Sequence, residues 1–195
     1  MWVYGDRSRR VSPRAALRAL TATLREVESG FAGAARHDAL TDAFLQASGL
    51  AQGIADAEFE TRGCDGASTT QDAAQALLIA LGRKLAASAW SGFATAGPPT
   101  SAELMALALS PLPDDVRVTT PEGYAFYAVY PEAYLKAAAE EPWTAPPFVI
   151  GIRSIGAGLA PLVAAVSNAA GVATVRPTGH PFRRQLRVSD ALRAR

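Results

Sequence analysis

Apolar side chains recur at intervals of three and four through the first half of the chain, and this spacing predicts helices. The predicted helices cover about residues 13–29, 37–60 and 70–91, each followed within a few residues by a glycine. Ser12, which precedes a proline, has the residue type that caps a helix N-terminus. Three helices with short connections predict a bundle-like region over residues 1–96. The positions predicted to be buried are Leu17, Leu20, Leu24, Val27, Leu40, Phe44, Ala47, Leu50, Ile54, Ala74, Leu77, Leu78, Leu81, Leu85 and Ala89.

The pattern changes in the middle of the chain, where prolines become frequent and β-branched and aromatic residues form short runs. Short helices are predicted within residues 97–111 and over residues 131–141. Strands are predicted over residues 116–120 and 124–130. These elements open a second predicted region, which covers residues 97–195.

The stretch PFVIGIRSIGAGLAPLVAAVSNAAGVATVRPTGHPF, residues 147–182, combines both kinds of pattern. An apolar run ends at Arg153, a glycine loop and an alanine-rich amphipathic segment follow, and a second apolar run ends at Arg176. Strand, loop, helix and strand in this order predict a βαβ unit with parallel strands. The predicted fold class is therefore α/β, with a helical N-terminal region followed by a partial parallel-sheet βαβ unit.

The glycine loop is the strongest candidate binding site in the sequence. In an open α/β sheet, ligands bind at the carboxyl ends of the strands, and a helix N-terminus there offers unpaired N–H groups to an anion. Glycines let the main chain approach a ligand closely and adopt positive φ, and the arginine adds a positive charge. These features predict a phosphate or pyrophosphate site, whose residues are Arg153, Ser154, Ile155, Gly156, Ala157 and Gly158.

Three better-known loop motifs are excluded at named positions. A Walker A loop needs a Gly-Lys-Ser/Thr sequence, but Gly156 is followed by Ala157 and Gly158. The dinucleotide fingerprint would need a third glycine where Pro161 stands. A nucleophile elbow would need a glycine in place of Ile152.

This order of parts resembles the type I phosphoribosyltransferase superfamily over about residues 121–185. VIGIRSIGAGLAPLVAAV resembles the family's pyrophosphate loop and its helix. VATVRPTGHPF resembles the next strand and the start of a mobile loop, with Arg176, Gly179 and His180 in it. The segment FYAVYPEAY resembles a YxxYPExY segment in a bacterial branch that has a helical region before the α/β part. The resemblance implies a phosphorylated sugar ligand, phosphoribosyl pyrophosphate, bound together with Mg²⁺.

The family's chemistry also needs a second motif, in which two acidic residues follow an apolar strand and a Thr/Gly-rich loop comes next. These residues bind the ribose hydroxyls and the 5′-phosphate of the substrate. No such motif follows the predicted mobile loop before Arg195. LPDDVRVTTPEG contains similar residues, among them Asp114 and Asp115, but it precedes the glycine loop and follows no strand. An Asp-rich turn is therefore favoured for it.

The expected function is that of a phosphoribosyltransferase-like protein, truncated or split, which carries the pyrophosphate loop but lacks full transferase activity alone. A half-built parallel sheet would leave an exposed strand edge, which favours a homo-oligomer or a complementing chain. The alternative is a non-enzymatic interaction protein of helical and α/β parts, in which the glycine loop is only a tight turn.

Composition excludes several other classes. Apolar residues make up 49% and charged residues 19%, enough for a sizeable core, and the net charge of +1 gives no general attraction for polyanions. One cysteine excludes an intramolecular disulfide framework, and two histidines without ligand spacing predict no metal site. Because the chain has no signal-peptide core and no run of about 18 apolar residues, we expect a cytoplasmic protein without a membrane partner.

Two charged segments are best explained as solvated surface. The tail from Arg176 carries six arginines against Asp190, which would attract nucleic acid, but a solvated or frayed tail is favoured. Asp56, Glu58 and Glu60 form an acidic run, for which a solvated helix face is favoured over a shared cation. Nucleic acid is therefore not expected as a partner.

Overall fold

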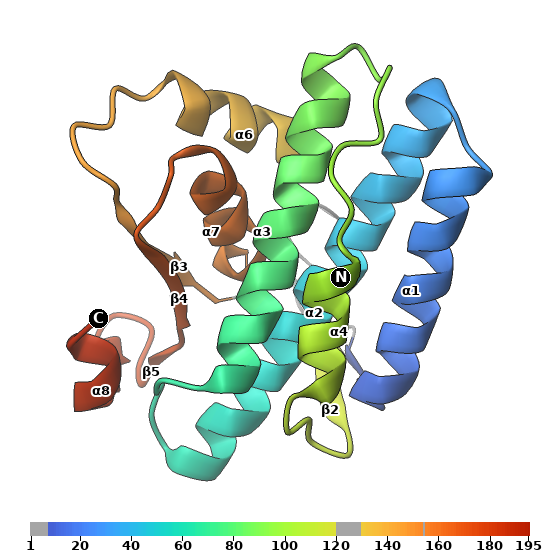
Figure 1. The fold of residues 1–195 in the computed structure, drawn as a ribbon. Coiled ribbons are helices and arrows are strands. Elements are labelled where there is room, and N and C mark those ends of the chain that lie inside the picture. Colours follow the sequence, from blue (N-terminus) through green and yellow to red (C-terminus); the bar gives the residue numbers. More distant parts are fainter. Residues whose placement is uncertain (1–7, 120–129, 154) are drawn as a thin grey trace, which may run out of the picture.

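The computed structural model describes residues 8–119, 130–153 and 155–195, and it places a group of long helices beside a small parallel sheet (Figure 1). The first helices are α1 (Pro13–Ser29), α2 (Gly33–Arg62), α3 (Thr69–Trp90) and α4 (Ser101–Leu109). The mixed α/β architecture, with its helical N-terminal region, is as the sequence predicts.

The first three helices form because their apolar side chains lie on faces that meet in one core. All the positions predicted to be buried in them are buried except Ala89, which is half-buried. Helix α2 ends at Gly63, whose φ of 72° is the left-handed conformation that suits glycine at a helix C-terminus. Helix α3 begins after Ser68, whose hydroxyl accepts a hydrogen bond from the N–H of Gln71.

Three two-stranded sheets complete the described fold. Strands β1 (Ser8–Val11) and β2 (Val116–Thr119) are antiparallel, and β1 was not expected from its polar sequence. Strands β3 (Phe148–Ile152) and β4 (Gly171–Val175) are parallel, as predicted, and strands β5 (Pro177–Thr178) and β6 (Gln185–Leu186) form an antiparallel hairpin. The remaining helices are α6 (Pro131–Glu140), α7 (Gly156–Val166) and α8 (Asp190–Arg193). The strand predicted over residues 124–130 lies almost wholly outside the described residues.

The helical region and the βαβ unit share one hydrophobic core, which crosses the boundary expected near residue 96. Leu162 of α7 and Leu135 of α6 belong to the same buried cluster as the leucines of α1, α2 and α3. Helices α3 and α7 come close at Gly82, where an added Cβ would lie 3.0 Å from the Cβ of Ala165. The sheet made by β3 and β4 is therefore fixed to the helices through α7.

One face of the parallel sheet remains open. Helix α7 packs against β3 and β4, but Phe148, Ile150 and Ile152 project from the other face of β3 and are 36%, 60% and 60% exposed. Within the described residues, β3 and β4 pair only with each other. Parallel sheets in proteins are normally covered on both faces, so this apolar face is an unusual feature of the surface.

The glycines at the junction of β3 and α7 serve close packing between two backbones. A Cβ on Gly151 would meet the carbonyl group of Gly156, whose carbon would lie 2.8 Å away. Gly156 and Gly158 lie in the first turn of α7, and neither has the positive φ that a phosphate-binding loop could use. The requirement for glycine at positions 151 and 156 thus has a structural cause that is independent of any ligand.

We expect Gly151→Ala to lower the free energy of unfolding by about 1–3 kcal/mol, because the added methyl group overpacks this contact between β3 and α7. Gly66→Ala is the matched control, since a Cβ there would lie 3.4 Å from its nearest neighbours. Urea unfolding followed by circular dichroism measures both variants. Equal midpoints for the two would contradict the packing explanation.

Candidate functional site

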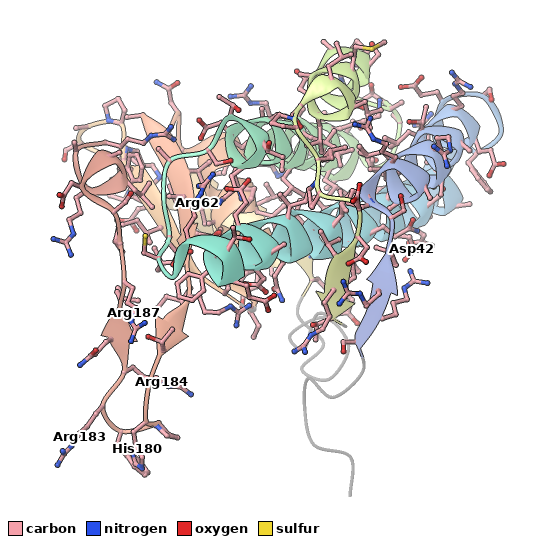
Figure 2. The ribbon with its side chains drawn as sticks, turned by 90° about the horizontal axis from the view of Figure 1, so that it is seen from below. Asp42, Arg62, His180, Arg183, Arg184 and Arg187 are labelled. Atoms are coloured by element: carbon pink, nitrogen blue, oxygen red, sulfur yellow. The ribbon has the colours of Figure 1, made fainter. Side chains whose placement is uncertain are left out.

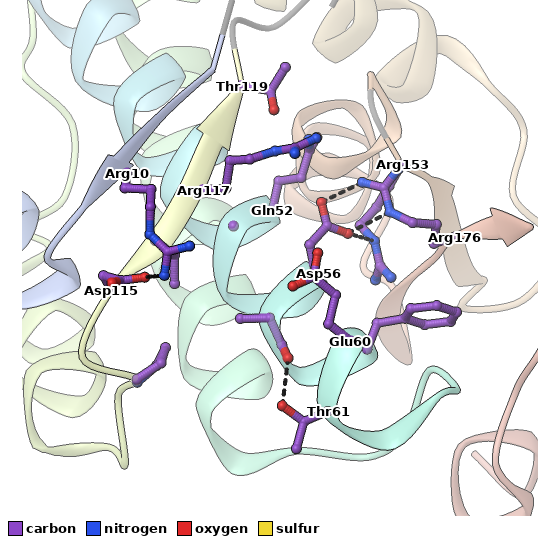
Figure 3. Close-up of a pocket in the computed structure, with 15 residues that line it drawn as sticks. Arg10, Gln52, Asp56, Glu60, Thr61, Asp115, Arg117, Thr119, Arg153 and Arg176 are labelled. Carbon is purple, nitrogen blue, oxygen red and sulfur yellow. Dashed lines mark hydrogen bonds and ion pairs between the residues drawn. The ribbon is translucent and has the colours of Figure 1, made fainter.

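A cavity lies at the carboxyl ends of the two parallel strands. Arg153 directly follows β3 and Arg176 directly follows β4, and both side chains line the cavity (Figure 3). Its other walls come from the second half of α2 and from strands β1 and β2. The cavity volume is about 840 Å³, within the usual range of about 300–1,000 Å³ for small-molecule sites.

Arg153 is completely buried, and its charge is neutralised by two carboxylates. Its Nη2 donates a hydrogen bond of 2.5 Å to Oδ1 of Asp65, and its Nε lies 2.9 Å from Oδ1 of Asp56. Nη1 donates to the backbone and hydroxyl oxygens of Thr174, at 3.2 and 3.3 Å. The ion pair at Nε is close but is not aligned as a hydrogen bond, so this N–H has no acceptor within the described residues. The guanidinium is thus largely committed to the protein.

Asp65 connects four parts of the chain, although it lies in a short loop between α2 and α3. Its Oδ2 accepts a 2.7 Å hydrogen bond from the backbone N–H of Arg176. Its own N–H donates to the carbonyl of Arg187 and its carbonyl accepts from the N–H of Ser189, both at 2.8 Å. The side chain is buried, so these hydrogen bonds and the ion pair with Arg153 compensate the removal of its charge from water.

Asp56 is the second carboxylate of this network, and it is shared by two arginines. Arg176 donates to it through both Nε, at 2.6 Å, and Nη2. Such two-point contacts between a guanidinium and a carboxylate fix geometry as well as charge. The interpretation of residues 56–60 as a solvated helix face is therefore wrong for Asp56. Glu58 is also engaged, because it accepts hydrogen bonds from Ser68 and Gln71.

The cavity carries a small excess of positive charge. Its lining includes four arginines, Arg10, Arg117, Arg153 and Arg176, and three acidic residues, Asp56, Glu60 and Asp115, so four minus three leaves one positive charge. Arg10 pairs with Asp115. Within the described residues, Arg117 forms no ion pair, and it extends from β2 along the cavity in Figure 3. Among the described residues that line the cavity, Arg117 is therefore the cation that remains available to a ligand.

The structure places the helix start of the predicted phosphate loop as expected, but not its arginine. Ile155 occupies the N-cap position of α7 in a helical conformation, and its carbonyl accepts hydrogen bonds from the N–H groups of Gly158 and Leu159. Ala157 and Gly158 are buried in the first turn, and Ser154 lies outside the described residues. The loop thus leads into a helix N-terminus at the end of a strand, as predicted, while its arginine turns toward Asp56 and Asp65.

The predicted mobile loop forms a hairpin, which we call the basic hairpin, residues 176–187. Gly179 has a φ of 89° in its turn, and His180 lies exposed at its far end. Figure 2 shows the hairpin projecting from the body of the molecule, with His180 and Arg183 at the tip. Arg176 is therefore at the cavity, whereas the structure does not bring His180 to it.

The role of the two carboxylates that organise this site, Asp56 and Asp65, was not identified from the sequence. Asp65 stands in a polar break without periodicity, so no pattern indicates that it is buried. Asp114 and Asp115, the acids of the rejected ribose-phosphate motif, precede β2, in agreement with an Asp-rich turn before a strand. The signal that could have found Asp65 is the presence of an arginine after each parallel strand, since two such charges need carboxylate partners.

A second polar cluster lies away from the cavity and has a structural explanation. His37 Nδ1 lies 3.0 Å from Oγ of Ser88, and His37 Nε2 lies 2.6 Å from Oε1 of Glu132. The order Ser, His, Glu is that of a catalytic triad, but Ser88 is buried within α3 and only 1% exposed. These contacts join α2, α3 and α6.

Comparisons with protein-family models, curated protein sequences and solved structures find no match for this chain. Among the residues that the structure describes, no group of three or more His, Cys, Asp or Glu side chains is placed to hold a metal ion. No helix in that part of the chain is long and apolar enough to cross a membrane.

We expect Asp65→Asn to lower the free energy of unfolding by about 3 kcal/mol or more, because it leaves the buried Arg153 with an incomplete set of charge partners. Asp190→Asn is the control, since Asp190 is exposed and only loosely paired with Arg193. Chemical denaturation compares the two midpoints. A wild-type midpoint for Asp65→Asn would show that the ion pair does not hold the strand ends together.

Proposed function

We propose that this chain is a phosphoribosyltransferase-like protein that binds the pyrophosphate group of phosphoribosyl pyrophosphate at the carboxyl edge of β3 and β4. The observation that carries the proposal is a cavity at the ends of both parallel strands, with α7 beginning at Gly156 shortly after β3 ends at Ile152. Ligands of open α/β sheets bind at this edge.

The available charges favour an anion of modest size. Arg117 contributes a guanidinium to the cavity. Helix α7 begins at Gly156, shortly after Arg153, and the positive end of its dipole would favour an anion nearby, although no α7 residue is among the described residues that line the cavity. Arg153 contributes less than its sequence position indicates, because Asp56 and Asp65 neutralise it. Binding should therefore be weaker than in a site where every arginine faces the ligand.

Mg²⁺ would accompany the pyrophosphate in this proposal. This cation prefers phosphate oxygens and water with only one or two protein carboxylates. The described residues offer no dedicated carboxylate cluster, so the metal would be brought by the ligand. Glu60, which lines the cavity without an ion pair among the described residues, is the acidic group available to it.

Catalysis by this chain alone is not part of the proposal. The sequence contains no second motif with two acids and a Thr/Gly-rich loop after the basic hairpin, and Asp114 and Asp115 stand before β2 instead. We therefore propose that the residues present hold the ligand without transferring its ribosyl group.

The alternative, a non-enzymatic interaction protein, is favoured by a different observation. Phe148, Ile150 and Ile152 form an exposed apolar face on β3, which is the kind of surface that another chain covers. In that case the cavity would hold no phosphorylated ligand.

Isothermal titration with phosphoribosyl pyrophosphate and Mg²⁺ should give saturable heat at up to millimolar ligand. Mixing the protein and this ligand with purine or pyrimidine bases should release no pyrophosphate.

Arg117→Ser should weaken binding about tenfold, because a charge-assisted hydrogen bond is lost. Gly158→Val should abolish binding by displacing the first turn of α7.

Arg18→Ser, which removes an exposed arginine from α1, is the charge-matched control and should leave the affinity unchanged. Circular dichroism establishes that each variant is folded. Absence of heat from the folded wild-type chain would leave the interaction protein as the better explanation. An Arg117→Ser variant with full affinity would place the ligand elsewhere.

A further inference from the structure

The basic hairpin is a built element and not a frayed tail. Its strands pair at Pro177 with Leu186 and at Thr178 with Gln185. The N–H of Arg183 donates to the carbonyl of His180 at 2.8 Å and closes the turn. Both ends of the hairpin are held by Asp65, through the N–H of Arg176 and the carbonyl of Arg187. The hairpin therefore stands out from a rigid base (Figure 2).

The structure separates the arginines of the C-terminal region into two groups. Arg176 is paired with Asp56, Arg193 lies 3.9 Å from Asp190, and Arg195 donates two hydrogen bonds to Asp72, at 2.6 and 2.8 Å. Those hydrogen bonds and the charge of Asp72 raise the pKa of Arg195. The second group is exposed, forms no ion pair within the described residues, and consists of Arg183, Arg184 and Arg187.

An aromatic side chain stands among these free charges. Phe182 is 91% exposed at the tip, and its ring centroid lies 5.7 Å from that of His180. No acidic residue occurs between residues 176 and 187. Three exposed guanidinium groups along one hairpin, with an exposed aromatic ring near its tip, combine attraction for phosphates with a platform on which a base can stack.

We propose that the basic hairpin binds a single-stranded nucleic acid, with Arg183, Arg184 and Arg187 on the backbone phosphates and Phe182 against a base. The net charge of +1 argues only against binding over the whole surface, and here the positive charge is concentrated on one projecting element. This inference does not depend on the proposed function, because it uses the tip of the hairpin and not the cavity.

Fluorescence anisotropy with a labelled oligouridine of about 12 nucleotides tests the proposal, since single-strand sites span about 4–16 nucleotides. The wild-type chain should bind at low salt, and the logarithm of its affinity should fall with the logarithm of salt with a slope of about −2. Three phosphate contacts at about −0.7 each on a single strand give this value. The double variant Arg183→Ser/Arg184→Ser should reduce the slope to about −0.7 and the affinity more than tenfold.

Phe182→Ala should weaken binding about tenfold while leaving the salt slope unchanged, because stacking involves no counterions. A duplex of equal length should bind more weakly than the single strand, since its bases are not free to stack on Phe182. These residues are exposed, so none of the variants should alter the fold, which circular dichroism checks.

Arg18→Ser/Arg25→Ser is the matched control, because it removes two exposed arginines from α1 and lowers the net charge by the same amount. Equal losses in the two double variants would overturn the proposal in favour of a general charge effect. Binding to vesicles that contain phosphatidylserine, without binding to oligouridine, would overturn it in favour of an anionic membrane surface. Absence of oligouridine binding at low salt would overturn it outright.

Discussion

The buried ion pair between Asp65 and Arg153 is the interaction on which the arrangement of the parallel sheet depends. Arg153 ends β3, and its carboxylate partner also accepts the N–H of Arg176, which follows β4. Within the described residues the parallel sheet has two strands and therefore few backbone hydrogen bonds, and its open face carries exposed apolar side chains. Asp65 therefore supplies, at the carboxyl ends of the strands, a connection to the helical region that further strands would otherwise provide.

This ion pair also decides what the cavity can bind. An arginine at the end of a strand and before a helix N-terminus would be the first cation to meet a phosphate. Here Asp56 and Asp65 neutralise it, and moving it toward a ligand would leave the buried carboxylate of Asp65 without its guanidinium partner, which costs several kcal/mol. Among the described residues that line the cavity, the positive charge left for a ligand consequently rests on Arg117, which forms no ion pair there.

Sequence periodicity predicted the helices and the βαβ unit because both follow from local spacing of apolar residues. The spacing of Leu17, Leu77 and Leu81 places each of them on the apolar face of its helix, and all three are buried. Asp56 and Asp65 could not be predicted in the same way, since their partners Arg153 and Arg176 lie about 90 to 120 positions away and only tertiary packing brings them together. The glycines illustrate a third case: the sequence pattern predicted that Gly156 makes room for a ligand, but Gly156 is also required by its close contact with Gly151.

Arg176 joins the two surfaces for which functions are proposed. Its guanidinium lines the cavity and pairs with Asp56. Its backbone N–H donates a hydrogen bond to Asp65 at the point where the basic hairpin begins. The carboxylate of Asp65 also holds Arg153 at the end of β3, and the backbone N–H of Asp65 donates to the carbonyl of Arg187 at the other end of the hairpin. Because these contacts are short, charged and largely buried, the hairpin cannot pivot about its base without disturbing the cavity wall. The orientation of the basic hairpin, which carries the free arginines, is thus set by the ion pairs and hydrogen bonds at the carboxyl edge of the parallel sheet.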